Sequence, residues 1–558
     1  MTDDDTRSRM KLEIVREAET VAAPAAGNAA AAQGDADAGG GADRKPSASA
    51  KMVASALDTH RPARRADGQR CLIPTAQDGP TIAIPLGEAA GLLRSRWWAE
   101  YKSAPKSSEI ADALGVLEAL ADQNAPEPIA VRCASTTDGQ AEGNTQQRAE
   151  IDRGLPDGSC YVIEGGRWSI GQPRTIFARP RRAGAMAEAD ASAGPDSWEK
   201  LGGYVHAADR TDLALVAAWA AFAMARPDAP CPILLMAGQQ GSGKTTGARA
   251  IKRLIDPGQP ESGRMPRDPT DLVLKAAQLR ALVVDNISRV SDDASDTLCT
   301  LVTGETIATR RLYSNDELFV AEARAAVIAT AIATPAIRGD LSDRMLALEL
   351  VAFDAGDDGA RRKSERQLWA DFDKERGAIL AGLLDLAADG LAAGPEGESE
   401  LARRESQPRM HDFSGFLAAI DHARDLGLLD RYLQQDASKA AAVIESSAVA
   451  ASLLRALHEH SDLSPLPPGL DEHQLEHTAG EILGLLAAPV PTPTSWPRTA
   501  RAISGELRRL APALAQLGVE LRTPEQAGRS RDTHRHRTFR ITWKPDAEAL
   551  ELAAEGGA

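Results

Sequence analysis

The residues best suited to chemistry lie in one stretch, Gly238–Thr245, which reads GQQGSGKT and fits the pattern G-x-x-x-x-G-K-[ST]. The apolar run Ile233–Met236 precedes it, and an amphipathic run with Ala248 and Ile251 follows. Glycines let backbone N–H groups curve around a polyphosphate, and the start of a helix adds positive potential there. The sequence therefore predicts a buried strand, a phosphate-binding loop and a helix.

This loop predicts a site for ATP and Mg²⁺. Lys244 is expected to reach the β- and γ-phosphates, and the hydroxyl of Thr245 is expected to hold Mg²⁺. The alternative is a flexible glycine turn that matches by chance, which the strand and helix on either side disfavour. The residues expected to hold the nucleotide are Gly238, Gln239, Gln240, Gly241, Ser242, Gly243, Lys244, Thr245 and Thr246.

Two further apolar runs end in polar side chains. Ala281–Val284 is followed by Asp285, a carboxylate that can hold the Mg²⁺ ion together with Thr245. The run that begins at Ala326 ends at the hydroxyl of Thr330. Because Ala281–Asp285 follows the glycine loop along the chain, we expect it to be the second nucleotide-binding motif.

Together these residues resemble the AAA+ ATPases of the superfamily 3 helicase type, and most closely the primase–helicase ATPases of phages and integrated mobile elements. The resemblance covers residues 198–352 best. It implies a parallel-sheet ATPase core that works on DNA as a homo-oligomer, by family analogy a hexamer. It implies that Gly238–Thr245 is the phosphate loop and that Asp285 is the acid at the end of the second strand. It makes Arg310–Phe319 the hairpin before the sensor strand and Thr330 the sensor. The arginine finger would be Arg338 or Arg344.

The chain departs from that family at two positions. The acid strand of the family normally ends in two acids, of which the second polarises the attacking water, but here the second is Asn286. Asparagine can orient a water molecule but cannot take its proton. Asp292, Asp293 or Glu305 could accept the proton in its place. The sensor is Thr330 where asparagine is frequent. We therefore expect hydrolysis that is slow or that needs DNA.

Several arginines have two interpretations each. Arg344 and Arg338 are either fingers that act on the nucleotide of a neighbouring subunit or members of surface ion pairs with Asp340 or Asp343. The hairpin that carries Arg310 and Arg311 is expected to point into a central channel and touch DNA phosphates. Its alternative is an ordinary extension of the sheet.

The C-terminal region predicts a winged helix that binds duplex DNA. Helices are expected over 479–487 and 498–510, with Pro512 starting a short turn, and strands over 519–522 and 537–543. Residues 496–545 hold 11 Lys and Arg against 4 Asp and Glu, in a chain whose net charge is −16. The alternative is a basic solvated loop. The expected DNA contacts are Arg501, Arg508, Arg509, Arg529, Arg531, Arg535 and Arg537.

The 558 residues predict an α/β protein of several domains. Five scattered cysteines without a C-x-x-C pair and the lack of a membrane-length apolar run predict a cytoplasmic protein. The expected units are a disordered leader (1–66), an α/β domain (67–182), the ATPase domain (197–355), a helical region (356–470), the winged helix (471–545) and a tail (546–558).

The expected function is that of a helicase-like ATPase in the DNA replication of a phage or mobile element. One alternative, favoured by Asn286, is an ATP-gated DNA-binding switch or loader that does not unwind. A small-molecule kinase is disfavoured by the basic C-terminal region. Primase activity is not expected, because the region before the ATPase shows no zinc motif or convincing acidic cluster.

Overall fold

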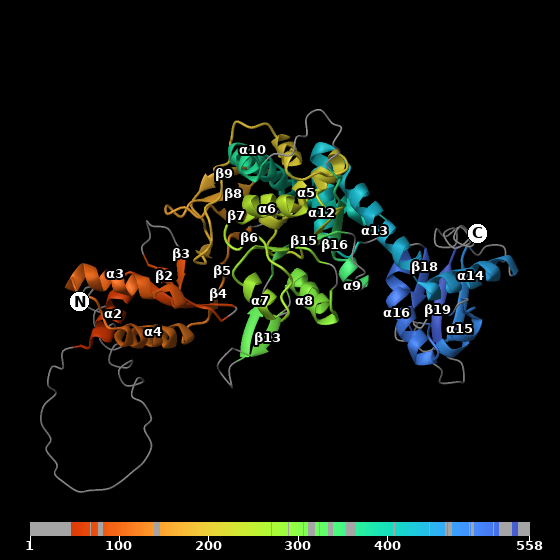
Figure 1. The fold of residues 1–558 in the computed structure, drawn as a ribbon, viewed down its shortest axis with the longest axis horizontal. Helices are drawn as coiled ribbons and strands as arrows, with labels where there is room; N and C mark the ends of the chain where they lie inside the picture. The colour runs from red at the N-terminus through yellow and green to blue at the C-terminus, as the bar shows by residue number, and fades with distance from the viewer. Residues whose placement is uncertain are drawn as a thin grey trace, which may run out of the picture.

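The computed structural model describes residues 46–544, with gaps at 67, 76–81, 139–145, 269, 288–289, 305, 311–317, 323, 333–338, 353–363, 405–407, 446, 464–465, 467–470, 490–491, 493–495, 517 and 524–537. These residues form a mixed α/β protein with several sheets, as the sequence predicts. A central body lies between an N-terminal body and a C-terminal body (Figure 1). The separate apolar clusters of these bodies define them.

The central body is built on a parallel sheet with the strand order β12-β15-β11-β16. Almost every residue of these strands is buried, as expected for a parallel sheet covered by helices. Strand β11 lies between two neighbours, since Leu234 is level with Ile328 on one side and Leu346 on the other. The strands span Ile233–Ala237 (β11), Ala281–Val284 (β12), Ala326–Ala331 (β15) and Met345–Glu349 (β16).

Helix α5 (Arg210–Ala225) is buried on all sides from Asp212 to Ala225, in keeping with its almost wholly apolar sequence, since a helix that is apolar all round belongs in a core. Helix α6 (Lys244–Ile255) starts directly after the glycine loop and buries one apolar face. The other helical elements of the central body are η2 (Ser197–Gly203), α7 (Thr270–Ala276), α8 (Asp292–Thr303), α9 (Gly339–Ser342), α10 (Glu365–Ala392), α11 (Gly394–Ala402), α12 (His411–Arg424) and α13 (Leu428–Glu445).

An antiparallel hairpin stands between α8 and β15. It consists of β13 (Thr306–Arg310) and β14 (Leu318–Glu322), with Arg310 paired to Leu318. The predicted strand–turn–strand is thereby confirmed for its two strands. Residues 311–317, which include Arg311, lie outside the described residues.

The N-terminal body begins earlier in the chain than the sequence analysis places it. Helix α2 (Ala48–Leu57) and strand β1 (His60–Arg65) fall within the expected leader of residues 1–66, and β1 pairs with β2. The expectation of disorder is wrong for this part of the leader, because Met52, Val53 and Ala56 pack against α4 in an apolar core. The other elements are β2 (Arg70–Pro74), β3 (Ile82–Pro85), η1 (Leu86–Glu88), α3 (Ala90–Tyr101), α4 (Ser107–Asp122), β4 (Pro126–Glu127), β5 (Ile129–Ala130) and β10 (Ile176–Ala178).

The second half of the expected domain 67–182 belongs to the central body. Strands β6 (Cys133–Asp138), β7 (Gln146–Asp152), β8 (Cys160–Glu164) and β9 (Arg167–Gly171) form an antiparallel meander. Its apolar side chains share one core with α5 and α10, and Trp168 Nε1 donates to Asp385 Oδ1 of α10 at 2.9 Å. Figure 1 shows these strands beside α6 and α10. The prediction of a single α/β domain over residues 67–182 is therefore wrong.

The C-terminal body also begins earlier than predicted. Its core includes Ile444 at the end of α13 and the apolar face of α14 (Ala448–Leu463), so residue 471 is not its boundary. The expected two strands are part of a three-stranded antiparallel sheet with the order β17-β19-β18. The remaining elements are β17 (His473–Thr478), α15 (Ala479–Leu485), α16 (Ala500–Gln516), β18 (Val519–Arg522) and β19 (Thr538–Trp543).

Helix α16 continues through Pro512, although the sequence predicts a helix end before it. Proline in a helix interior costs about 3 kcal/mol because it removes a backbone hydrogen bond. Leu514 lies beyond the proline and is fully buried, in line with Ile503, Leu507 and Leu510. Burial of a leucine side chain contributes about 1.5–3 kcal/mol. That burial offsets much of the cost of the proline.

Among the described residues, no single helix is long and apolar enough to cross a membrane, and only the bent pair of α10 and α11 meets the criterion by length and composition.

Candidate functional site

The glycine loop connects the carboxyl end of β11 to the first turn of α6. Gly241 and Gly243 have φ angles of 90° and 80°, in the left-handed region that favours glycine. A Cβ atom on Gly238 would lie 2.8 Å from Ser242 Oγ and 2.9 Å from the carbonyl oxygen of Leu350. The loop therefore needs glycine at these positions to keep its tight curve.

Lys244 lies back over this loop. Its Nζ donates to the carbonyl oxygens of Gly238 and Gln239, each at 2.7 Å. Burial lowers the pKa of Lys244, while the carboxylate of Asp285 acts in the opposite direction. Gln239 and Gln240 are exposed and Thr246 is half-buried in the first turn of α6. The ammonium group is thus held at the loop by neutral carbonyl groups.

Asp285, which follows β12, links the first turn of α6 to β15 at the same edge of the sheet. Its Oδ1 accepts a hydrogen bond from Thr245 Oγ1 at 2.8 Å and another from Thr330 Oγ1 at 2.6 Å. Thr330 Oγ1 in turn accepts the backbone N–H of Asn286 at 2.8 Å. The structure therefore brings together the predicted magnesium ligands and the predicted sensor, which lie far apart in the sequence.

Asn286 adopts a left-handed backbone conformation with a φ angle of 60°, and its side chain is exposed. Asparagine tolerates this conformation better than most residues. Asp292 and Asp293 lie in the first turn of α8, which the chain enters after leaving β12 at the same edge of the sheet. Glu305, the third candidate for activating water, lies outside the described residues.

Arg344 does not join this cluster. Its carbonyl oxygen accepts the N–H of Ile233 at 2.8 Å, at the start of β11 and thus at the opposite edge of the sheet. Strands rise about 3.3 Å per residue, so β11 separates the two edges by about 17 Å. The guanidinium donates to the carbonyl oxygen of Asp340 at 2.6 Å. Arg338 lies outside the described residues.

The predicted DNA contacts of the C-terminal body fall into two groups. Arg501, Arg508 and Arg509 are exposed on α16, where Arg509 pairs with Glu506 and Arg508 donates to Ser504 Oγ at 3.1 Å. Arg529, Arg531, Arg535 and Arg537 lie outside the described residues, as does the side chain of Arg310.

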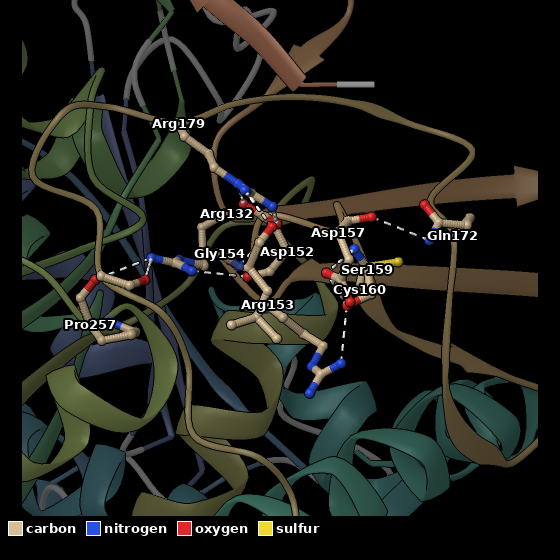
Figure 2. A network of polar contacts seen from close by, with 12 residues as sticks. Arg132, Asp152, Arg153, Gly154, Asp157, Ser159, Cys160, Gln172, Arg179 and Pro257 are labelled. Carbon is tan, nitrogen blue, oxygen red and sulfur yellow. Dashed lines mark hydrogen bonds and ion pairs between the residues drawn. The ribbon is translucent and has the colours of Figure 1, made fainter. Parts of the chain in front are cut away.

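A buried polar network that the sequence did not predict lies behind the loop helix α6. At the end of α6, Asp256 accepts a bond from Lys252 Nζ at 2.6 Å and another from Arg132 Nε at 3.1 Å. Arg132 also donates to the carbonyl oxygen of Asp152, whose carboxylate binds Arg179 (Figure 2). The spacing of Lys252 and Asp256 by four residues on one helix was the available signal. The network ties α6 to the β6–β9 meander.

Among the described residues, no group of three or more His, Cys, Asp and Glu side chains could hold a metal ion alone. Thr245 and Asp285 supply only two oxygen ligands. Mg²⁺ commonly uses one or two protein oxygens together with substrate phosphates and waters, so this donor set fits Mg²⁺ bound with a nucleotide.

Two protein-family models match the chain. The first is described as "Actinomycete integrative conjugative element replication protein" and matches residues 199–438. The second, "AICE RepA C-terminal domain", matches residues 449–552. The first match includes the whole cluster around Asp285, and the second begins within α14, in agreement with the early start of the C-terminal body.

Two solved structures to which the chain is similar are remote in sequence. The structure titled "The A form apo structure of NrS-1 C terminal region-CTR" is 11% identical, with 70% of this chain and 95% of that chain covered and a TM-score of 0.30. "The apo structure of NrS-1 C terminal region (305-718)" gives the same identity and coverage with a TM-score of 0.27. No curated protein matches the chain. The two family models follow one another along the chain and identify it as a replication protein of a mobile element.

Proposed function

We propose that the chain is an ATP-hydrolysing, helicase-like motor in the DNA replication of its mobile element. The observation that carries this proposal is the convergence of Lys244, Thr245, Asp285 and Thr330 at one edge of the parallel sheet. Open α/β sheets commonly bind ligands outside the carboxyl ends of their strands. On this proposal, β11, the glycine loop and α6 form a P-loop core.

The loop would hold the phosphates of ATP through its backbone N–H groups and Lys244, and Thr245 and Asp285 would hold Mg²⁺. When bound, ATP would supply the γ-phosphoryl group that is transferred to water, and Mg²⁺ would neutralise negative charge on the phosphate oxygens. Lys244 now donates to carbonyl groups of its own loop, so its ammonium group is already placed beside the phosphate cradle. Thr330 restrains Asp285 through a bond of 2.6 Å. The Gly238 cradle, which a Cβ atom would fill, fits this role.

The residue that orients the attacking water is proposed to be Asn286, with Asp292 or Asp293 as proton acceptor. Asn286 is exposed next to Asp285, and its backbone is anchored on Thr330 Oγ1. An amide cannot take a proton, so this arrangement agrees with the slow or DNA-dependent hydrolysis expected from the sequence.

The DNA contacts and the assembly complete the proposal. We propose that the C-terminal body is a winged helix that holds duplex DNA with α16, and that the β13–β14 hairpin contacts a single strand. Arg344 lies at the sheet edge opposite its own loop, so an arginine-finger role requires a second copy, and we propose a homo-oligomer, by resemblance a hexamer. We propose a cytoplasmic location, because five scattered cysteines without a C-x-x-C pair are typical of a reducing compartment.

The test is steady-state ATP hydrolysis with and without single-stranded DNA, for the wild type and for Lys244→Ala. We expect DNA-stimulated turnover that falls by at least about 100-fold in Lys244→Ala, because charge stabilisation of the transferred phosphoryl group typically contributes this much or more. The matched control is Lys374→Ala, whose side chain is 77% exposed, and it should retain wild-type turnover. Equal turnover in wild type and Lys244→Ala would refute the assignment of the loop.

An ATP-gated DNA-binding switch is the second candidate, and the observation that favours it is Asn286 at the position of a proton-accepting acid. This function predicts ATP-dependent DNA binding with negligible turnover. Asn286→Glu should then raise the hydrolysis rate. A motor that already hydrolyses ATP well should change little or lose activity on the same substitution.

A further inference from the structure

The N-terminal body presents an aromatic surface on helix α3, which packs on α2 and α4 (Figure 1). Of the tryptophan, tyrosine and phenylalanine side chains that the structure describes, only Trp98 and Tyr101 are exposed, by 56% and 37%. Residues three apart on a helix are neighbours, so both rings lie on the same side of α3. This surface therefore differs from the rest of the described surface in offering large rings to a partner.

Trp98 is the ring that is open to stacking. The Tyr101 ring is already in contact with other groups, since its centroid lies 4.2 Å from that of Trp97 and 5.3 Å from Lys51 Nζ. Within the described part of the chain, no aromatic ring stacks on Trp98 and no cation lies over it. Two turns earlier on the same side of α3, a Cβ atom on Gly91 would meet nothing within 4 Å. The surface beside the ring is thus open as well.

The charge around Trp98 is positive. Arg94 and Lys102 lie four residues before and after it, so they flank the ring on one side of the helix. Both are exposed, and neither forms an ion pair in the part of the chain that the structure describes. Residues 90–106 hold four Lys and Arg against one acid, Glu100, in a chain whose net charge is −16. Such a local basic surface in an acidic protein suits a partner that carries phosphates.

The positions of the other charges support this interpretation. Arg96 donates to the carbonyl oxygen of Ser55 at 2.5 Å and to Thr59 Oγ1, so only neutral groups hold its guanidinium. Glu100 lies two residues from Trp98, and residues two apart on a helix do not face each other. The acid is therefore placed away from the side of α3 on which Arg94 and Lys102 flank the ring.

We propose that this side of α3 binds single-stranded DNA, with one base stacked on Trp98 and backbone phosphates at Arg94 and Lys102. The two cations lie about 12 Å apart along the helix, one on each side of the ring. Proteins that bind single strands commonly combine aromatic rings with positive charge in this way. The inference does not depend on ATP hydrolysis, and the site is separate from the β13–β14 hairpin and the C-terminal body.

The ring favours a single strand over other anionic partners. Bases in a duplex are already stacked on their neighbours, so a duplex would use the two cations but not the indole. An acidic protein segment would likewise be held by charge and offers no base to stack. Stacking on an aromatic side chain is sequence-tolerant, because every base has a π-face, so we expect little preference for base sequence.

The experiment cross-links the full chain, without nucleotide, to an oligo-dT strand that carries photoreactive 5-iodouracil. Trypsin cleaves after Lys and Arg, so residues 97–102 form one fragment on which mass spectrometry detects attached DNA. We expect this cross-link in the wild type, in Trp98→Tyr and in the control Ile170→Ala, a side chain of β9 that is 46% exposed. Trp98→Ala should lose it by at least about fivefold, because loss of one base stack lowers affinity about 5- to 150-fold.

The role of the cations is read from binding of fluorescent oligo-dT over a range of salt concentrations. We expect Arg94→Gln to lower the slope of log K against log[salt] by about 0.7, the change for one phosphate of a single strand that is no longer neutralised. The control Arg376→Gln, an arginine of α10 that is 40% exposed, should leave the slope unchanged.

Three results would overturn the proposal. The first is a wild type without a cross-link on residues 97–102, and the second is an equally strong cross-link in Trp98→Ala. The third is displacement of the strand from this fragment by duplex DNA or poly-glutamate as effectively as by unlabelled oligo-dT, because the ring would then contribute nothing. Lys244→Ala should cross-link like the wild type, so a failure of the proposed ATPase activity leaves this test intact.

Discussion

Replacement of Thr330 by valine removes one hydroxyl at the centre of the candidate site and keeps the shape of the side chain. The hydroxyl donates to Asp285 at 2.6 Å and accepts the N–H of Asn286 at 2.8 Å, and Thr330 is only 1% exposed. A hydrogen bond to a charged group contributes about 1.5–3 kcal/mol, and a buried group left unpaired costs about 1–3 kcal/mol. We expect Thr330→Val to lower the free energy of local opening at this edge by about 2–4 kcal/mol.

Hydrogen exchange read by mass spectrometry measures this opening directly. A change of about 1.4 kcal/mol is tenfold in an equilibrium constant, so amides in 281–287 should exchange about 30-fold to several hundred-fold faster in Thr330→Val. Affinity for Mg²⁺-ATP should fall with it, because Asp285 loses one of its two hydroxyl donors.

Thr330→Ser is the matched control, since it keeps the hydroxyl and loses only a methyl group. Removal of one buried methyl group costs about 1 kcal/mol, so exchange should rise by less than about tenfold. Equal acceleration in the serine and valine variants, or none in either, would refute the argument that the hydroxyl holds this edge together.

Two further predictions concern stability. Lys252→Met leaves Asp256 without one of its buried partners and should lower the free energy of chemical unfolding by about 3–5 kcal/mol. The control Lys374→Met, at an exposed pair with Asp371, should change it by less than about 1 kcal/mol. A similarly small effect of Lys252→Met would contradict the stabilising role of the network. Burial, and to a lesser extent His460, lowers the pKa of His473, so the folded C-terminal body favours neutral histidine. That stability is complete above the unfolded pKa of about 6.5 and is lost as the pH falls from there through the lower pKa of the folded state. Exchange of β19 amides should therefore accelerate on acidification in the wild type and less so in His473→Phe.

Local features of the chain could be predicted because their signals lie within a few residues. The glycine loop, the buried helix α5 and the strands β13 and β14 all lie where the sequence patterns place them. Gly165 and Gly166 have positive φ angles between β8 and β9, and two consecutive glycines are a sequence signal for such a two-residue hairpin turn. In each case the conformation depends on neighbouring residues.

Boundaries were predicted less well because they depend on which apolar faces meet. The β6–β9 meander packs on α5 and α10, and no local signal distinguishes that partner from the N-terminal sheet. The continuation of α16 past Pro512 depends on the burial of Leu514 in the C-terminal core. The local effect of proline predicts instead that the helix ends before Pro512.

The sequence alone determined the residue types at the candidate site: a lysine and a threonine after a glycine loop, an acid and a hydroxyl after two apolar runs. Only the tertiary structure decided that Thr330 contacts Asp285 and that Arg344 lies at the opposite edge. The physical reason is that the order of strands in the sheet sets these neighbours, and this order follows from long-range packing that no short stretch of sequence contains.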